Sequence, residues 1–130
     1  MMLDDRDDTT AKLCDFGLSL ILGPGEKVNE SMGTLEYCAP EIIYQRPYSF
    51  EIDIWALGVI LYRMICGDLI FEYDDKDKVA FSIAKREISY HHRQWSKASA
   101  EVMDLLKKML VKEPSKRISI EEVMRHPWLL

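Results

Sequence analysis

The chain has 130 residues, of which 48% are hydrophobic and 30% are charged, a balance typical of a soluble globular protein with one core. Its formal net charge of −5 argues against nucleic acid as the main partner. The apolar run of residues 55–66 is interrupted by Gly58 and Arg63 and is too short to span a bilayer, so no membrane partner is expected.

The cysteines and the amino-terminal residues indicate in which cellular compartment the protein is expected. Cys14, Cys38 and Cys66 are odd in number and have no C-x-x-C spacing, so they indicate neither a zinc site nor a disulfide framework. Residues 1–5 lack the basic and then apolar layout of a signal peptide. A reducing compartment, the cytoplasm, is therefore expected.

The amino-terminal part predicts two short strands and a long loop. Apolar residues 1–3 and residues 11–14 predict the strands, and the polar stretch 4–10 predicts a solvated turn between them. This acidic turn does not indicate a calcium-binding EF-hand loop, because it has no central glycine. Residues 18–33 contain a Gly-Pro-Gly sequence and several polar residues, and they predict a loop without regular structure.

Helices are expected in the rest of the chain. A short helix from Pro40 to about Tyr44 fits the preference of proline for the first helical turn. Ser49 is a candidate N-cap for a helix from about residue 50 to residue 66, which Gly67 would end. This second helix has almost no polar face, as expected of a helix buried in the core of a domain.

Shorter amphipathic helices follow. Residues 76–86 predict one, and Ser99 is a candidate cap for another over residues 100–110, whose apolar side chains fall on one stripe. Ser119 and Glu122 form a capping-box pattern at the start of a last short helix. The predicted fold is therefore mainly α, with short strands near the amino terminus and helices around one very apolar central helix.

Short sequence motifs in a fixed order indicate a family. They are Asp15-Phe16-Gly17, Ala39-Pro40-Glu41 and Asp53-x-Trp55-x-x-Gly58. The first alone is common by chance and would be a surface turn, but the combination is specific. The chain resembles the carboxy-terminal, large lobe of a eukaryotic serine/threonine protein kinase. Its last part, with Pro114-Ser115-Lys116-Arg117 and His126-Pro127-Trp128, is similar to the calcium-dependent and calcium/calmodulin-dependent protein kinases.

The resemblance implies ATP and Mg²⁺ as cofactors of the full kinase. Asp15 would hold the magnesium ion that bridges the nucleotide phosphates. Phe16 would pack beneath Asp15 and set its orientation, and Gly17 would permit the backbone turn. The cofactor-binding and metal residues implied for this chain are therefore Asp15 with its two neighbours.

Residues 33–41, with the sequence Gly-Thr-Leu-Glu-Tyr-Cys-Ala-Pro-Glu, resemble the substrate-binding loop of serine/threonine kinases rather than that of tyrosine kinases. Gly33, Thr34 and Leu35 would present the substrate. Thr34 matches the threonine whose hydroxyl bonds the catalytic aspartate, and Leu35 would line the pocket for the residue after the phosphorylated one. Proteins with a serine or threonine target are the implied substrates, and a nonspecific loop is the alternative.

Glu30 and Ser31 lie in the stretch that corresponds to the activation loop. Glu30 precedes Gly33 by three residues, where many kinases carry an activating phosphothreonine, so its charge would mimic part of that phosphate. An ordinary exposed glutamate is the alternative, because the arginine that would pair with it belongs to a catalytic loop that this sequence lacks. Ser31 is a candidate phosphorylation site.

Other matching residues have structural roles in the family. The resemblance pairs Glu41 with Arg117, an ion pair that offsets the cost of burying a carboxylate. Asp53 would bond the backbone of the catalytic loop, and since that loop is absent here, an acceptor without a protein partner, filled by water, is expected. Trp55 and Gly58 are expected to be packing residues, and an ordinary core position also explains Trp55.

The sequence departs from the family pattern after the central helix. Residues 68–71, Asp-Leu-Ile-Phe, stand where the family usually has two prolines before an aromatic residue. Arg63 occupies a helix position that is acidic in some kinases that prefer basic substrates. A preference for basic residues before the target hydroxyl therefore does not follow.

Before Asp15 the sequence has no glycine-rich loop, no Val-Ala-Ile-Lys lysine and no His-Arg-Asp catalytic loop. We therefore expect residues 1–130 to be a partial protein kinase domain without the small lobe, with no complete set of catalytic residues. ATP would bind only with the missing small lobe, and the chain alone would be inactive. Apolar surface left uncovered should bind a partner or aggregate. The alternatives are a non-catalytic substrate- or partner-binding module and a helical scaffold unrelated to kinases.

Overall fold

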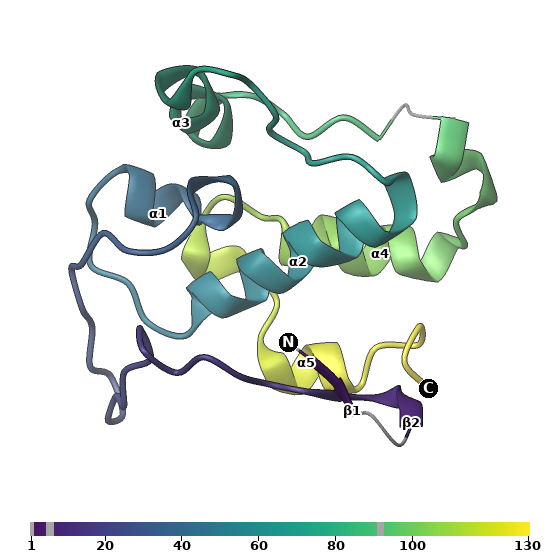
Figure 1. Cartoon of the computed structure of the whole chain (residues 1–130), viewed down its shortest axis with the longest axis horizontal. Helices are drawn as coiled ribbons and strands as arrows, with labels where there is room; N and C mark the ends of the chain where they lie inside the picture. The colour runs from purple at the N-terminus through teal and green to yellow at the C-terminus, as the bar shows by residue number, and fades with distance from the viewer. Residues whose placement is uncertain (1, 5–6, 91–92) are drawn as a thin grey trace.

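The computed structural model describes residues 2–4, 7–90 and 93–130 (Figure 1). The helices are α1 (Pro40–Ile43), α2 (Glu51–Cys66), α3 (Lys76–Lys85), α4 (Ala100–Met109) and α5 (Ile120–Met124). Short 3-10 helices are η1 (Leu35–Tyr37), η2 (Arg93–Lys97) and η3 (Pro114–Lys116). Strands β1 (Met2–Asp4) and β2 (Asp7–Lys12) pair antiparallel. The mainly helical fold expected from the sequence is confirmed.

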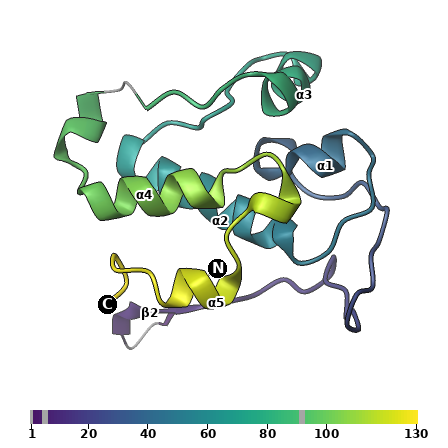
Figure 2. The same ribbon diagram turned by 180° about the vertical axis from the view of Figure 1, so that it is seen from behind.

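Helix α2 lies through the middle of the molecule, with α4 beside it in both views (Figures 1 and 2). Trp55 and Val59 of α2 and Leu106 of α4 have no exposed surface and belong to one hydrophobic cluster. Gly58 allows the two helices to approach closely, because a Cβ atom at this position would lie 2.8 Å from Cδ2 of Leu110. Trp55 and Gly58 therefore occupy packing positions.

Most of the expected helix ends are present. Gly67 ends α2 in the left-handed region, with φ 82°, and its N–H closes the last turn of the helix. The Ser99 hydroxyl accepts a hydrogen bond from the N–H of Val102 at the start of α4. At the start of α5, Ser119 and Glu122 each accept a hydrogen bond from the backbone N–H of the other. These local signals were readable from the sequence.

The expected cap at Ser49 is wrong. Phe50 is the residue that precedes α2, and it already has right-handed helical angles, φ −65° and ψ −17°, with no side-chain cap. Helix α2 begins at Glu51, one residue later than a cap at Ser49 predicts. The backbone of Tyr48, directly before Ser49, exchanges two hydrogen bonds with Val28, of 2.9 and 3.0 Å. A contact distant in sequence therefore overrides the local capping signal.

The strands also differ from the expectation. β2 begins at Asp7, within the polar stretch expected to form a turn, and it ends at Lys12 rather than at residue 14. Antiparallel pairing places Met2 opposite Lys12 and Leu3 opposite Ala11, so the partner strand sets the bounds of β2 rather than its own residue preferences. The centre of the expected turn, residues 5 and 6, lies outside the described residues.

Helix α2 is not buried on all sides, contrary to the expectation. Leu57, Ile60 and Met64 are 46%, 39% and 75% exposed. The sequence is apolar around the whole helix, but the described elements leave the face with these three residues exposed, so the expected uncovered apolar surface is present. No helix within the described ranges is long and apolar enough to cross a membrane.

Candidate functional site

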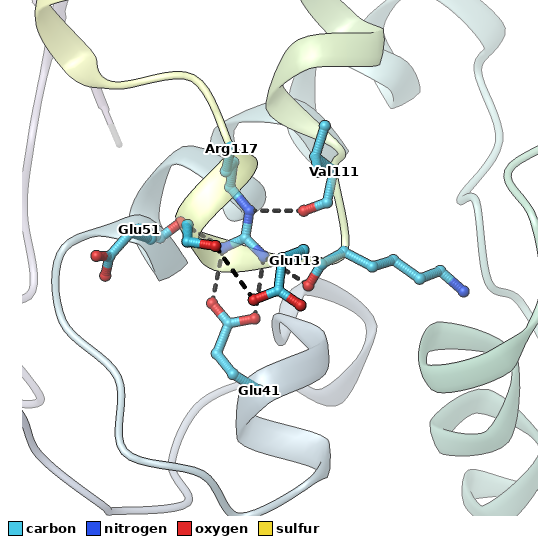
Figure 3. Close-up of polar contacts among 7 residues, drawn as sticks. Glu41, Glu51, Val111, Glu113 and Arg117 are labelled. Atoms are coloured by element: carbon cyan, nitrogen blue, oxygen red, sulfur yellow. Dashed lines mark hydrogen bonds and ion pairs between the residues drawn. The ribbon is translucent and has the colours of Figure 1, made fainter.

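A buried ion pair joins the start of α1 to the segment after η3 (Figure 3). Pro40 stands in the first turn of α1, and Glu41 follows it with 3% of its surface exposed. Arg117 is 7% exposed, and its two terminal nitrogens donate to the two carboxylate oxygens of Glu41 at 2.7 and 3.0 Å. The pair expected between these residues is therefore present, in a bidentate geometry.

The remaining donors of Arg117 are also satisfied. Its Nε donates to the carbonyl of Val111 at 2.9 Å, and Nη1 donates to the carbonyl of Glu51 at 2.7 Å (Figure 3). The guanidinium carbon lies 5.2 Å from the ring centre of Trp55. Arg117 thus links α1, the start of α2 and the loop after α4, and leaves the buried charge well compensated.

The segment of the predicted substrate loop is held in a defined shape. Gly33 has φ 102°, which favours glycine, and Thr34 directly precedes η1. The buried thiol of Cys38 donates to the carbonyl of Thr34 at 3.4 Å. Burial raises the pKa of the Cys38 thiol, and the charge of Glu36 acts in the same direction, which keeps Cys38 a neutral packing residue. Leu35 packs against the main core.

A contact that the sequence did not reveal ties this loop to the central helix. Nη1 of Arg63 donates to the hydroxyl of Tyr37 at 2.9 Å, across 26 positions of sequence. Arg63 lies in the last turn of α2 and Tyr37 in η1, so the bond links η1 to α2. No spacing rule relates the two residues, so only the structure identifies the pair.

Asp15, at the expected magnesium position, has an unusual backbone conformation. Its φ is 64°, in the left-handed region that residues with a side chain rarely adopt. Gly17 lies in a turn, as expected, and the N–H of Ser19 closes this turn by donating to the carbonyl of Phe16 at 3.0 Å, but Gly17 itself has no positive φ. Asp15 is exposed, and no described residue donates a hydrogen bond to its carboxylate. Strain of this kind is concentrated at functional sites in proteins.

Phe16 does not pack beneath Asp15 as expected. Its side chain is 66% exposed, and Leu13, Leu18 and Ile21 nearby are exposed as well. The segment between β2 and the Gly-Pro-Gly turn runs alongside α5, on the opposite side of α2 from α1 (Figures 1 and 2). Phe16 packs neither against the main core nor against the smaller cluster of Ile54, Leu105, Met109 and Val123, and the structure does not bring this segment next to the substrate loop.

The structure also describes the surroundings of two other acidic residues predicted to matter, Asp53 and Glu30. Asp53, in the first turn of α2, accepts no hydrogen bond from the described residues, and partial desolvation raises the pKa of its carboxyl group. Glu30 is exposed in the loop before Gly33. Burial raises the pKa of Tyr48, and the negative charge of Glu30 raises it further. Ser31 is also exposed.

Comparisons with known proteins give a consistent result. The family model described as the protein kinase domain matches residues 1–129. The chain is 40% identical over 129 residues to calcium-dependent protein kinase 14 of Arabidopsis thaliana. The match covers 99% of this chain and 24% of that protein. It is 40% identical over 129 residues to calcium-dependent protein kinase 22 of Oryza sativa subsp. japonica, covering 99% of this chain and 22% of that protein.

A relative outside plants gives a similar match. Serine/threonine-protein kinase 17A of Oryctolagus cuniculus is 41% identical over 118 residues, covering 91% of this chain and 30% of that protein. The chain thus spans between about a fifth and a third of the length of these relatives.

Proposed function

Because the chain belongs to the protein kinase family, and its relatives are serine/threonine kinases, we propose that residues 1–130 form part of the large lobe of a domain that transfers the γ-phosphate of ATP to protein serine or threonine hydroxyls. The observation that carries this proposal is the match of the kinase family model to residues 1–129. The buried Glu41–Arg117 pair supports it, because it joins the end of the predicted activation segment to the last helices.

Asp15 is the residue we propose for Mg²⁺. Its exposed carboxylate supplies the hard oxygen ligand that Mg²⁺ prefers, and one or two protein carboxylates together with substrate phosphates are the usual ligands of this ion. The left-handed backbone of Asp15 fits a position at which a strained conformation serves a function. When bound, Mg²⁺ neutralises charge on the phosphates of ATP during transfer. Phe16 and Gly17 complete the proposed cofactor segment.

Gly33, Thr34 and Leu35 are the residues we propose to position the substrate. Thr34 is exposed at the start of η1, with its carbonyl held by the buried Cys38 thiol, so its hydroxyl is displayed from a fixed backbone. Leu35 packs on the core and supports the loop from below. Precise placement of the target hydroxyl is the main contribution a protein makes to phosphoryl transfer.

The activation loop is proposed to carry its charge on Glu30, with Ser31 as a site of phosphorylation. Both side chains are exposed and therefore accessible to a partner or to a modifying kinase. A cytoplasmic location is proposed from the cysteines, which form no disulfide in the part of the chain that the structure describes.

A chimeric kinase tests the proposal. The 129 aligned residues of the Arabidopsis relative would be replaced by the corresponding residues of this chain, and transfer of labelled phosphate from ATP to a serine-containing peptide would be measured. We expect activity that Asp15→Asn abolishes and that Glu101→Gln, an exposed acidic residue on α4, leaves unchanged. A folded chimera without activity would overturn the proposal.

The 130-residue chain tested alone is expected to be inactive, because its sequence holds no catalytic loop to supply the base. Phosphate transfer by the purified chain that disappears in Asp15→Ala would contradict this expectation. The alternative function, a non-catalytic substrate- or partner-binding module, predicts a folded but inactive chimera together with direct binding of a kinase substrate peptide in the absence of ATP.

A further inference from the structure

The outward surface of α3 carries a small apolar hollow. Its volume is about 250 Å³, and Tyr73, Phe81 and Ser82 contribute to its lining. Phe81 lies on α3 and is 61% exposed, although a side chain of this size gains much by burial. An exposed aromatic ring beside an apolar hollow has the composition of the anchor points that dominate binding energy in protein interfaces.

Tyr73, which forms one wall of this hollow, is held in place by contacts within the chain. The guanidinium carbon of Arg86 lies 5.5 Å from the ring centre of Tyr73, and Arg86 also donates a hydrogen bond to the Tyr73 hydroxyl. Both contacts restrict the rotation of Tyr73. A ligand that enters the hollow therefore meets a wall that needs no further ordering, which favours binding.

A second hollow, of about 580 Å³, adjoins the first and is acidic. Tyr73 and Lys78 line both hollows, so the two form one continuous surface, which we call the α3 surface. Acidic side chains outnumber basic ones on this surface. The acidic ones are Glu36, Glu72, Asp74, Asp75 and Asp77, and the basic ones are Lys78 and Arg86.

Most of this negative charge is not neutralised by the chain. Asp75 caps α3 by accepting the N–H of Asp77 at 2.9 Å. Within residues 7–90 and 93–130, no lysine or arginine lies within ion-pair distance of Glu36, Glu72 or Asp74. The acidic side chains that line the α3 surface outnumber the basic ones, so its net charge is negative, and a concave surface of net negative charge attracts basic partners.

We propose that the α3 surface docks a segment of a partner protein in which two or more lysine or arginine residues stand next to a large apolar residue. The basic residues lie against Glu36, Glu72 and Asp74, and the apolar residue enters the hollow beside Phe81. The pairing follows from the juxtaposition of the apolar and acidic hollows, and it is independent of phosphate transfer and of the proposed function.

Fluorescence anisotropy with the 130-residue chain and a labelled peptide tests the proposal. The probe is a twelve-residue peptide with two Arg-Lys pairs beside two leucines and with no serine, threonine or tyrosine, so it cannot act as a phosphate acceptor. We expect a dissociation constant on the order of 10–100 µM, as for a small transient interface, which weakens as salt is raised. A peptide with glutamate in place of the basic residues is expected not to bind.

Matched variants locate the binding. Phe81→Ala and the double change Glu72→Gln with Asp74→Asn should each weaken binding by about tenfold, and the double change should also reduce the salt dependence. Phe50→Ala, equally exposed but located at the start of α2, and Glu101→Gln on α4 should leave the affinity unchanged. Phe81 is largely exposed, so its replacement should not unfold the chain.

Three results would overturn the proposal. The first is no binding at about 1 mM peptide, a limit that corresponds to a free energy too small for a docking role. The second is binding that none of the α3 variants alters. The third is self-association of the chain, seen by sedimentation, that Phe81→Ala abolishes, because the surface would then be an interface between copies of this chain.

Discussion

The segment from β2 to Gly25 and the body formed by α1 to α5 differ in how the chain supports them. In the body, Trp55, Val59 and Leu106 have no exposed surface. Along the segment, Phe16 is 66% exposed, and the backbone hydrogen bonds after β2 include short turns such as that of the Ser19 N–H with the Phe16 carbonyl. The body therefore has a core that accounts for its shape, whereas the residue proposed for Mg²⁺ lies on a segment that the described chain does not hold against that core.

The residues that stabilise the fold therefore differ from the residues proposed to take part in phosphate transfer. The Glu41–Arg117 pair and the α2–α4 contact are complete within the chain, with their donors, acceptors and packing partners all present. The proposed roles of Asp15 and Thr34 require groups beyond those that the chain supplies. Changes in the body should therefore alter stability strongly, and changes in the segment should alter it little.

The largest loss of stability is expected for Arg117→Ala. The change leaves the buried carboxylate of Glu41 without a partner and removes a guanidinium that contacts Trp55. The free energy of unfolding, measured by urea titration, should fall by about 3–5 kcal/mol. Arg125→Ala, at an exposed position after α5, is the control and should change it by less than about 0.5 kcal/mol. If Arg117→Ala lowers the free energy of unfolding as little as the control does, the body formed by α1 to α5 does not depend on this ion pair as described.

A smaller loss is expected for Gly58→Ala. The added Cβ would lie 2.8 Å from Leu110 Cδ2 and 3.1 Å from Met109 Cβ, so the Leu110 side chain, or the two helices, must shift. The expected cost is about 1–3 kcal/mol in the same urea titration. Gly17→Ala is the matched control, because a Cβ there would meet only Asp15 Oδ1 at an ordinary 3.5 Å. Equal effects of the two changes would show that the close helix contact is absent in solution.

Two aspartates should respond to pH with opposite signs. Hydrogen bonds from Lys108 and His126 lower the pKa of Asp104 below its ordinary value of 3.8, so its charge stabilises the folded chain above that pH, and this contribution is lost as pH falls through the lowered pKa. Burial raises the pKa of Asp53, so its charge disfavours folding at neutral pH, and this effect disappears as pH falls through the raised pKa.

The corresponding variants make this contrast measurable. At pH 7, Asp104→Asn should lower the melting temperature and Asp53→Asn should raise it, and both differences should shrink as the pH approaches the pKa of each group. Thermal melts recorded from pH 7 down to pH 3 would show it. Shifts of the same sign for both variants would mean that the electrostatic surroundings differ from those described.

The smallest effect is expected for Phe16→Ala. Its ring is mostly exposed, so truncation creates no cavity, and the free energy of unfolding should change by less than about 0.5 kcal/mol. Phe71→Ala, which removes a ring that is 3% exposed, should cost about 3–5 kcal/mol. A large loss for Phe16→Ala would show that this ring packs against the body in solution.

Local sequence signals predicted the parts of the fold that depend on local physics. Gly67, Ser99 and Ser119 act within one helical turn, and each is present where the sequence indicated. The Glu41–Arg117 pair spans 76 positions, and only the resemblance to a family predicted it. No pattern within the sequence relates two residues at that separation.

The errors share a physical cause. The cap at Ser49 failed because the pairing of Val28 with Tyr48 sets the entry to α2. The expected packing of Phe16 is wrong because its segment does not pack against the cluster of Ile54, Leu105, Met109 and Val123 that joins α5 to α2 and α4. In each case a contact between distant segments, or its absence, outweighs the local preference. The link between Arg63 and Tyr37 went unseen for the same reason.

Hydrogen exchange tests the central contrast most directly. Mass spectrometry of the folded 130-residue chain would compare peptides from α2 and α4 with peptides from residues 13–27. We expect the helical peptides to exchange slowest, at rates set by global unfolding, and residues 13–27 to exchange almost as fast as an unfolded chain. Equal protection of the two regions would contradict the account, because the segment that carries Asp15 would then be held by the body.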